Sequence, residues 1–127
     1  MNGWNTTLCD ISPAVKQALE GIDCGVPFTL RRGFARGNFS APLVVWREWS
    51  NVSTDCPVVD AVSFEVTVLA PDMDQLNALC QGVNQALVGM GLRRSYAAPD
   101  KFDGQNYVKT FRFGRGIDKR TMRLVDQ

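Results

Sequence analysis

The residue types that could carry out chemistry in this 127-residue sequence are four cysteines and scattered carboxylates, because the chain contains no histidine. The absence of histidine excludes Ser-His-Asp and Cys-His nucleophile systems and histidine-ligated zinc. Cys9, Cys24, Cys56 and Cys80 lack the C-x-x-C spacing that zinc sites and redox pairs need. We therefore expect four reduced thiols, no metal and no cofactor.

Two pairs of aspartates lie close together in the sequence, and both fit structural roles. Asp100 and Asp103 belong to the stretch Pro-Asp-Lys-Phe-Asp-Gly, which is typical of a turn in which aspartates accept backbone hydrogen bonds. Asp72 and Asp74 suit the positive end of a helix dipole. Because these groups form no nucleophile, acid or metal set, we expect no catalytic residue and no enzyme activity.

Arginine and phenylalanine are interleaved in one short segment that is rich in glycine. The residues concerned are Arg31, Arg32, Phe34, Arg36 and Phe39. Such side chains can hold phosphates and stack on bases, but the glycines and the asparagine break the segment into a loop, unlike the aromatic strand of an RNA-recognition module. We interpret it as a mobile loop that reaches a partner protein or faces DNA without reading its sequence.

The composition is that of one globular domain. Hydrophobic residues make up 45% of the chain, and 14 Lys and Arg against 13 Asp and Glu leave a net charge of +1, so no global field attracts nucleic acid. The longest apolar runs are far below the roughly 20 residues that span a bilayer. The first residues also lack the pattern of a signal peptide. We expect a protein that is made in the cytoplasm and does not contact membranes.

Hydrophobic periodicity predicts two helices. The first begins near Ser12 and Pro13 and ends between Gly21 and Gly25. The second runs over 72–90, with Asp72 and Gln75 in a reciprocal capping-box arrangement and with Cys80 on its apolar stripe as a small hydrophobe. Strand patterns occur at 28–32, 43–49, 59–70, 92–96 and 105–113, the last two as a hairpin.

These elements predict an α+β fold. The segment 59–70 alternates between an apolar and a mostly polar face, and the helix over 72–90 is expected to cover the apolar one. Because sequence-adjacent strands usually pair as hairpins, we expect a mostly antiparallel sheet covered by one long helix, with a short N-terminal helix and an extended C-terminal arm. Residues 1–113 form the single domain in this interpretation, and 114–127 form the arm.

Two groups of side chains are candidates for subunit or partner contacts. One is the uncharged polar face of the second helix, which costs less to desolvate than a charged face. The other is the basic part of the C-terminal arm, expected to become ordered on a neighbour or to fray. Their members are Asn77, Gln81, Asn84 and Gln85 on the helix, and Arg115, Lys119, Arg120 and Arg123 on the arm.

The order of these motifs resembles the tail terminators of long-tailed bacteriophages, also called tail-completion or tail-to-head joining proteins. The resemblance covers roughly residues 8–113. It lies in the short first helix and in the stretches Ala41-Pro-Leu-Val-Val-Trp-Arg-Glu48, Val59 to Ala70, Asp74-x-Leu76-x-x-Leu79, Ala86-Leu87, Gly91-Leu-Arg-Arg94 and Lys109-Thr-Phe-Arg-Phe113. The loop 33–42 and the tail after Phe113 depart from the family pattern.

The resemblance implies a structural virion protein without a catalytic role. Such a protein forms a ring, a hexamer in similar proteins, that caps the tail tube, stops its polymerisation and offers a surface to the head-completion or connector protein. Its location would be the virion tail or neck, after assembly in the host cytoplasm, and DNA would pass without specific contacts. The alternatives are another neck or tail-tube component, or a small nucleic-acid-binding module that uses the loop 31–39.

Overall fold

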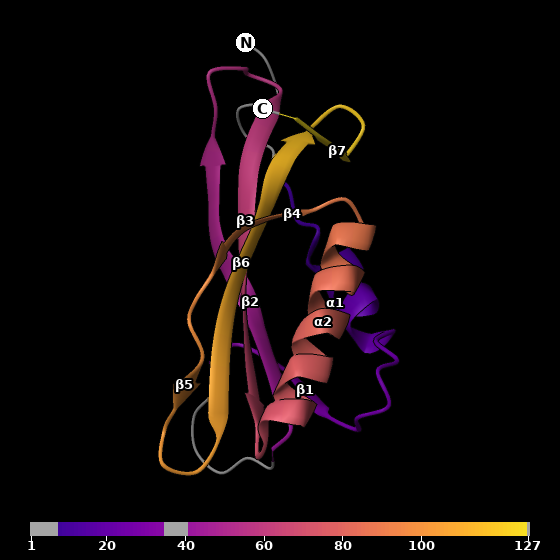
Figure 1. Ribbon diagram of the computed structural model, residues 1–127. Coiled ribbons are helices and arrows are strands. Elements are labelled where there is room, and N and C mark those ends of the chain that lie inside the picture. The colour runs from indigo at the N-terminus through magenta and orange to yellow at the C-terminus, as the bar shows by residue number, and fades with distance from the viewer. Residues whose placement is uncertain (1–7, 35–40, 127) are drawn as a thin grey trace.

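The structure is a computed structural model that describes residues 8–34 and 41–126. Seven strands form a single twisted sheet, and two helices pack on one side of it (Figure 1). The strand order is β1-β2-β3-β6-β4, and β5 and β7 pair with β6 off this path. The elements are α1 (Ser12–Glu20), β1 (Thr29–Arg32), β2 (Leu43–Ser53), β3 (Val59–Ala70), α2 (Met73–Gly89), β4 (Arg93–Ala97), β5 (Lys101–Phe102), β6 (Tyr107–Asp118) and β7 (Arg123–Val125).

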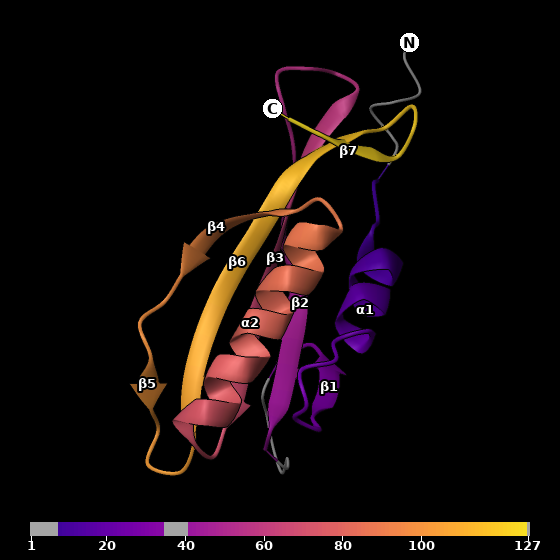
Figure 2. The same ribbon diagram turned by 45° about the vertical axis from the view of Figure 1, so that its right-hand side comes forward.

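The main core lies between the sheet and the two helices. In β3 every second side chain from Val62 to Val68 is buried there, and the apolar stripe of α2 meets them from Leu76 to Leu87. The turned view shows α1 beside α2, on the β1 side of the sheet, with β4 and β5 at the far edge (Figure 2). None of the helices in the described part of the chain has the length and apolar character to cross a membrane.

The start of α2 follows the predicted capping only in part. Asp72 is the N-cap, and its Oδ1 accepts a hydrogen bond of 2.8 Å from the backbone N–H of Gln75. The return bond of a reciprocal capping box is not formed, since Oε1 of Gln75 is buried without a hydrogen-bond partner among the described residues. The aspartate alone therefore fixes where this helix begins.

The expected fold class is wrong in two respects: the sheet is not antiparallel throughout, and more than one helix covers it. The sheet is mixed, because β1 pairs with β2 in parallel through the register Thr29 to Leu43. β1 has four residues and is about 13 Å long, so even the short connection 33–42 can return the chain to run beside it.

Two helices, α1 and α2, share the covered face of the sheet. Five strands make a sheet about 19 Å wide, which one helix about 10 Å across cannot cover.

The prediction of an extended C-terminal arm over 114–127 is also wrong. β6 continues past Phe113 to Asp118 and pairs with β3 along its whole length, and β7 folds back onto its end. Ile117 is fully buried in the main core. Gly114 and Gly116 lie within the paired part of β6, opposite Ser63 and Ala61 on the uncovered face.

Candidate interaction surface

Five side chains form a continuous stack across the sheet face that the helices leave uncovered. Guanidinium groups and aromatic rings alternate in it, in the order Phe34, Arg47, Trp49, Arg112 and Tyr96, and we call this set the arginine–aromatic ladder. The Arg47 guanidinium carbon lies 4.8 Å from the ring centre of Phe34 and 5.1 Å from that of Trp49. The Arg112 guanidinium carbon lies 3.8 Å from Trp49 and 5.4 Å from Tyr96. Both arginines are therefore held in cation–π contacts.

Glu65 on β3 fixes the two guanidinium groups from below. Its Oε1 lies 3.0 Å from Nη2 of Arg47, and its Oε2 lies 3.2 Å from Nε of Arg112. The three residues are direct neighbours on β2, β3 and β6, so the sheet register brings them together. Two cations share one half-buried carboxylate, which leaves this group with one excess positive charge.

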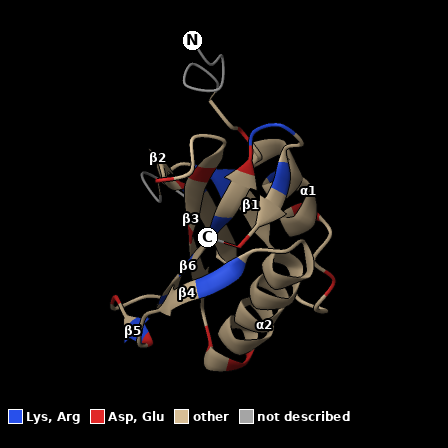
Figure 3. Ribbon diagram, turned by 90° about the horizontal axis from the view of Figure 1, so that it is seen from above, with Lys and Arg blue, Asp and Glu red and all other residues tan. Residues whose placement is uncertain are grey.

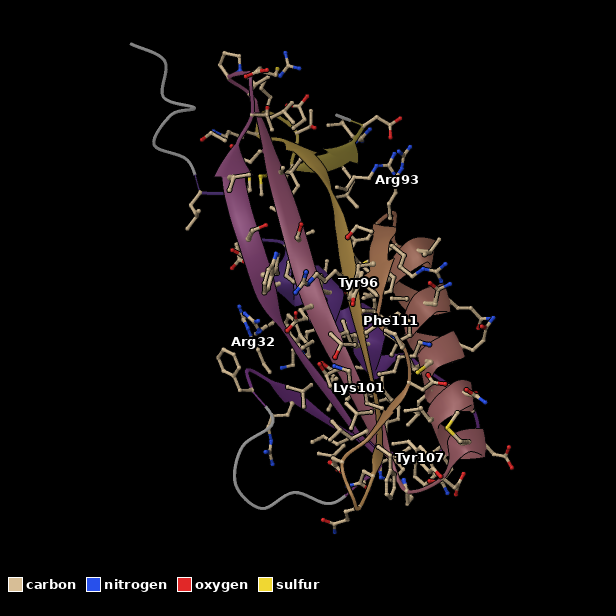
Figure 4. All side chains as sticks on the ribbon, turned by 60° about the vertical axis from the view of Figure 1, so that its left-hand side comes forward. Arg32, Arg93, Tyr96, Lys101, Tyr107 and Phe111 are labelled. Carbon is tan, nitrogen blue, oxygen red and sulfur yellow. The ribbon has the colours of Figure 1, made fainter. Side chains whose placement is uncertain are left out.

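A β-bulge aims the last ring of the ladder. The register shifts between Arg94 and Tyr96, so that Tyr96 stands opposite Arg112, on the uncovered face. Strict alternation after Arg94 would turn Tyr96 toward the core side instead. Figure 4 labels Tyr96 on β4 and Arg32 on β1, at opposite sides of the sheet. The ladder thus spans the strands between two edges.

The three rings of the ladder are unusually open to solvent for their size. Phe34 is 54% exposed, Trp49 44% and Tyr96 47%. Exposed aromatic groups that are ordered by arginines lose little conformational freedom when a partner covers them. Trp, Tyr and Arg are also the residue types that contribute most to protein interfaces. The ladder therefore has the composition and rigidity of a protein contact surface.

No protein-family model matches the chain, and no curated protein matches it.

A shallow hollow of about 440 Å³ continues this face toward β7. Its floor is made of small residues, including Ala61, Ser63 and Gly114. On its rim, Oδ1 of Asp126 accepts hydrogen bonds from Arg93 at 2.6 Å and from Arg115 at 2.8 Å. The hollow extends the uncovered face, but its charged residues Arg93, Arg115 and Asp126 are paired with one another.

Three of the four predicted amide residues lie together. Asn77, Gln81 and Asn84 line a groove of about 360 Å³ between α2 and the strands β4 and β6. Oδ1 of Asn84 accepts a hydrogen bond of 3.1 Å from Arg94. Gln85 is exposed on α2 but does not line this groove. The helix face is thus a polar surface on the opposite layer from the ladder.

The predicted basic residues of the C-terminal region are mostly engaged within the chain. Arg115 donates to the carbonyl of Gly91 and to Asp126, and Arg120 forms a two-pronged pair with Asp118. The side chain of Lys119 is buried against Asp60, so it cannot be a surface contact as expected. Only Arg123 of this group is exposed without a hydrogen bond or ion pair from its side chain among the described residues.

The residues predicted to act together in the loop 31–39 do not lie on one surface. Arg32 lies over the ring of Trp46 and donates to Oγ of Ser12, so it faces the helical side. Arg31 is a half-buried residue of β1, and Phe34 belongs to the ladder. Arg36 and Phe39 lie outside the described residues. The described part therefore places these side chains on two different faces.

The cysteines and the turn aspartate Asp103 have surroundings typical of residues with a structural role. All four cysteines are free, and burial raises the pKa of Cys80 to about 11, which disfavours the reactive thiolate. Oδ1 of Asp103 accepts the backbone N–H groups of Gln105 and Asn106, as expected for a turn. Within residues 8–34 and 41–126 no three His, Cys, Asp or Glu residues lie close enough to hold a metal ion.

Sequence reasoning missed most of the ladder. Arg47, Glu65 and Arg112 lie in segments that were predicted as strands, and the alternation over 59–70 indicated that Glu65 points away from the core. Their partnership depends on the register between strands that lie up to 47 positions apart in the sequence. Tyr96 depends on the bulge, for which the residues 92–96 give no sign.

Proposed function

We propose that this protein is a structural virion protein that associates with its own copies in a ring and caps the tail tube of a long-tailed bacteriophage. The arginine–aromatic ladder is the observation that carries the proposal. It is a contact surface on the sheet face that the helices leave uncovered, as a protein that acts by binding other protein surfaces requires. The motif order of residues 8–113 supplies the link to tail terminators.

Capping of the tube by a ring requires that each subunit contacts its neighbours through two different surfaces. A subunit that contacts its neighbours through two different patches closes a ring when the rotation between subunits fits the circle. The ring presents one end to the last tube layer, while its other end differs from that layer. Further tube subunits then find no matching surface, and growth stops. The exposed end is free to receive a head-completion or connector protein.

The test is a tube-growth assay. Purified tail-tube protein from the same phage is allowed to polymerise with and without this protein, and tube lengths are measured by negative-stain electron microscopy. We expect shorter tubes with an annular density at one end, and lengths that fall as the ratio of this protein to tube protein rises. Trp49→Ala should weaken capping, whereas Phe102→Ala, at an exposed aromatic site on β5 outside the ladder and the helices, is the comparison variant.

Unchanged tube lengths and bare tube ends at every ratio would overturn the proposal. Incorporation along the whole tube would identify a tube component instead of a cap. Steeply salt-dependent binding to single-stranded DNA, combined with no effect on tubes, would favour the nucleic-acid-binding alternative.

A further inference from the structure

Charge is divided unequally between the two layers of the molecule. The helical layer, residues 8–28 and 71–92, has five carboxylates and one cation, and all six side chains are exposed. They are Asp10, Glu20, Asp23, Asp72, Asp74 and Lys16. Seen from above, α2 has no blue segment, whereas β4 carries a broad blue band (Figure 3). The outer surface of the helices is therefore acidic.

The sheet layer has the opposite balance. Residues 29–34, 41–70 and 93–126 contain twelve Lys and Arg against eight Asp and Glu. On the uncovered face itself, Arg47 and Arg112 share the single carboxylate of Glu65. Three of the twelve cations of the sheet layer lie on the helical side: Arg32 donates to Ser12, Arg94 donates to Asn84, and Lys109 lines the groove beside α2. The outer surface of the helices is thus acidic and rich in amides, with Arg94 and Lys109 at its border, whereas the uncovered face is basic around the ladder and rich in aromatic rings.

We infer that the partner of the ladder is the helical layer of a second copy of this chain. The two surfaces are complementary in charge, which favours their encounter in the correct orientation. Amide and carboxylate groups such as those of Gln81 and Asp74 are hydrogen-bond acceptors that match the guanidinium and indole donors of the ladder. The amides of α2 also cost less to desolvate than charged groups.

The alternative contact between two copies, ladder against ladder, is disfavoured by the same charges. It would bring Arg47 and Arg112 of one copy against the same arginines of the other, with only two carboxylates for four guanidinium groups. A contact between unlike faces leaves one ladder and one helical layer free at the ends of every open chain. Association then continues, and a ring closes where the rotation between subunits fits the circle. The inference deepens the proposed function, because it supplies the contact between subunits of the ring.

Two variants, each defective in one face, test this directly. The first is Trp49→Ala/Tyr96→Ala, which removes two rings of the ladder. The second is Glu20→Lys/Asp23→Lys/Asp74→Lys, which reverses three exposed charges of the helical layer and spares the Asp72 cap. Circular dichroism and thermal melting verify that both remain folded. Their oligomeric states are measured, alone and mixed, by sedimentation velocity and native mass spectrometry.

We expect the wild-type chain to form a discrete oligomer that dissociates when salt is raised. Each variant alone should associate at least about tenfold more weakly than the wild type. An equimolar mixture should yield a one-to-one heterodimer, because each variant retains the face that the other has lost. As a matched pair of single substitutions, Asp74→Lys should weaken association, while Asp55→Lys, at an exposed site in the turn 54–58, should not.

Several results would overturn the inference. They are a helical-layer variant that associates like the wild type, a mixture that gives no heterodimer, or a wild-type chain that stays monomeric at all concentrations. If the ladder instead binds single-stranded DNA as a monomer, its partner is nucleic acid. Tube capping by a protein whose variants all associate normally would reject this contact and leave the proposed function standing.

Discussion

Nζ of Lys119 lies 3.1 Å from Oδ1 of Asp60, and both residues are almost completely buried, at 7% and 4% exposure. The pair joins the turn after β6 to the start of β3. Cys9 lies beside it, and burial together with the nearby Asp60 charge raises the pKa of this thiol. The C-terminal turn is therefore anchored in the domain by a buried ion pair.

Lys119→Met is expected to reduce the free energy of unfolding by about 3–5 kcal/mol, because it leaves the Asp60 carboxylate buried without its counter-charge. The double variant Asp60→Leu/Lys119→Met removes both charges and should recover most of the loss. Urea unfolding followed by circular dichroism measures both. A single variant as stable as the wild type would show that the pair does not hold this turn.

Glu65→Gln is expected to destabilise the fold by about 1–3 kcal/mol, since Arg47 and Arg112 then lose a shared charged hydrogen-bond acceptor. Glu20→Gln is the matched control. Glu20 is exposed and lies 3.9 Å from Lys16, so its loss should change stability by less than about 0.5 kcal/mol. Equal effects of the two substitutions in urea unfolding would contradict the role given to Glu65.

The Asp118 carboxylate is predicted to titrate unusually low. Hydrogen bonds from the side chain and backbone N–H of Arg120 lower its pKa from 3.8 to about 2. Because the pKa in the folded state is lower than in the unfolded state, this group stabilises the fold above about pH 4, and the contribution is lost as the pH falls toward 2. At pH 3, nuclear magnetic resonance of the side-chain carboxyl carbon should show a mostly ionised group.

Arg120→Ala removes the side-chain hydrogen bonds but keeps the backbone one, so it should raise this pKa part of the way toward 3.8 and increase the protonated fraction of Asp118 at pH 3. Arg123→Ala, which removes an exposed arginine of β7, should leave the titration unchanged. An identical Asp118 signal in the wild type and in Arg120→Ala would refute the assignment of the shift to Arg120.

Gly114→Ala is expected to destabilise the sheet by about 1–3 kcal/mol. A Cβ atom at this position would lie 2.8 Å from Oγ of Ser63 and 2.9 Å from the carbonyl oxygen of Val62, and the carbonyl belongs to the paired backbone of β3. Gly89→Ala is the control, because a Cβ there meets nothing within 4 Å and a helical alanine gains up to about 1 kcal/mol. Thermal melting should therefore move in opposite directions for the two variants.

Local elements of this fold were predictable because their signals are local. The alternation over 59–70 gave β3 with its true bounds, and the apolar stripe after Asp72 gave α2 to within a residue at either end. β2 runs on to Ser53, four residues beyond the prediction, because pairing with β3 extends it through polar residues that have little strand propensity.

Features that depend on pairing between distant segments were not predictable. The parallel pairing of β1 and β2 follows no short-range pattern, and the ladder requires a register among four strands. The C-terminal region was interpreted as an arm because it is rich in charged residues and offers few apolar residues to bury. Asp60 and Asp118, which pair with Lys119 and Arg120, turn it into an integral part of the sheet.

The ladder is assembled from segments that are synthesised far apart in time. Trp49 belongs to the first half of the chain, whereas the guanidinium that stacks on it belongs to Arg112, near the C-terminus. A polypeptide still emerging from the ribosome therefore lacks this surface until Arg112 has been synthesised. In the proposed ring, contacts through this surface would therefore be confined to folded subunits.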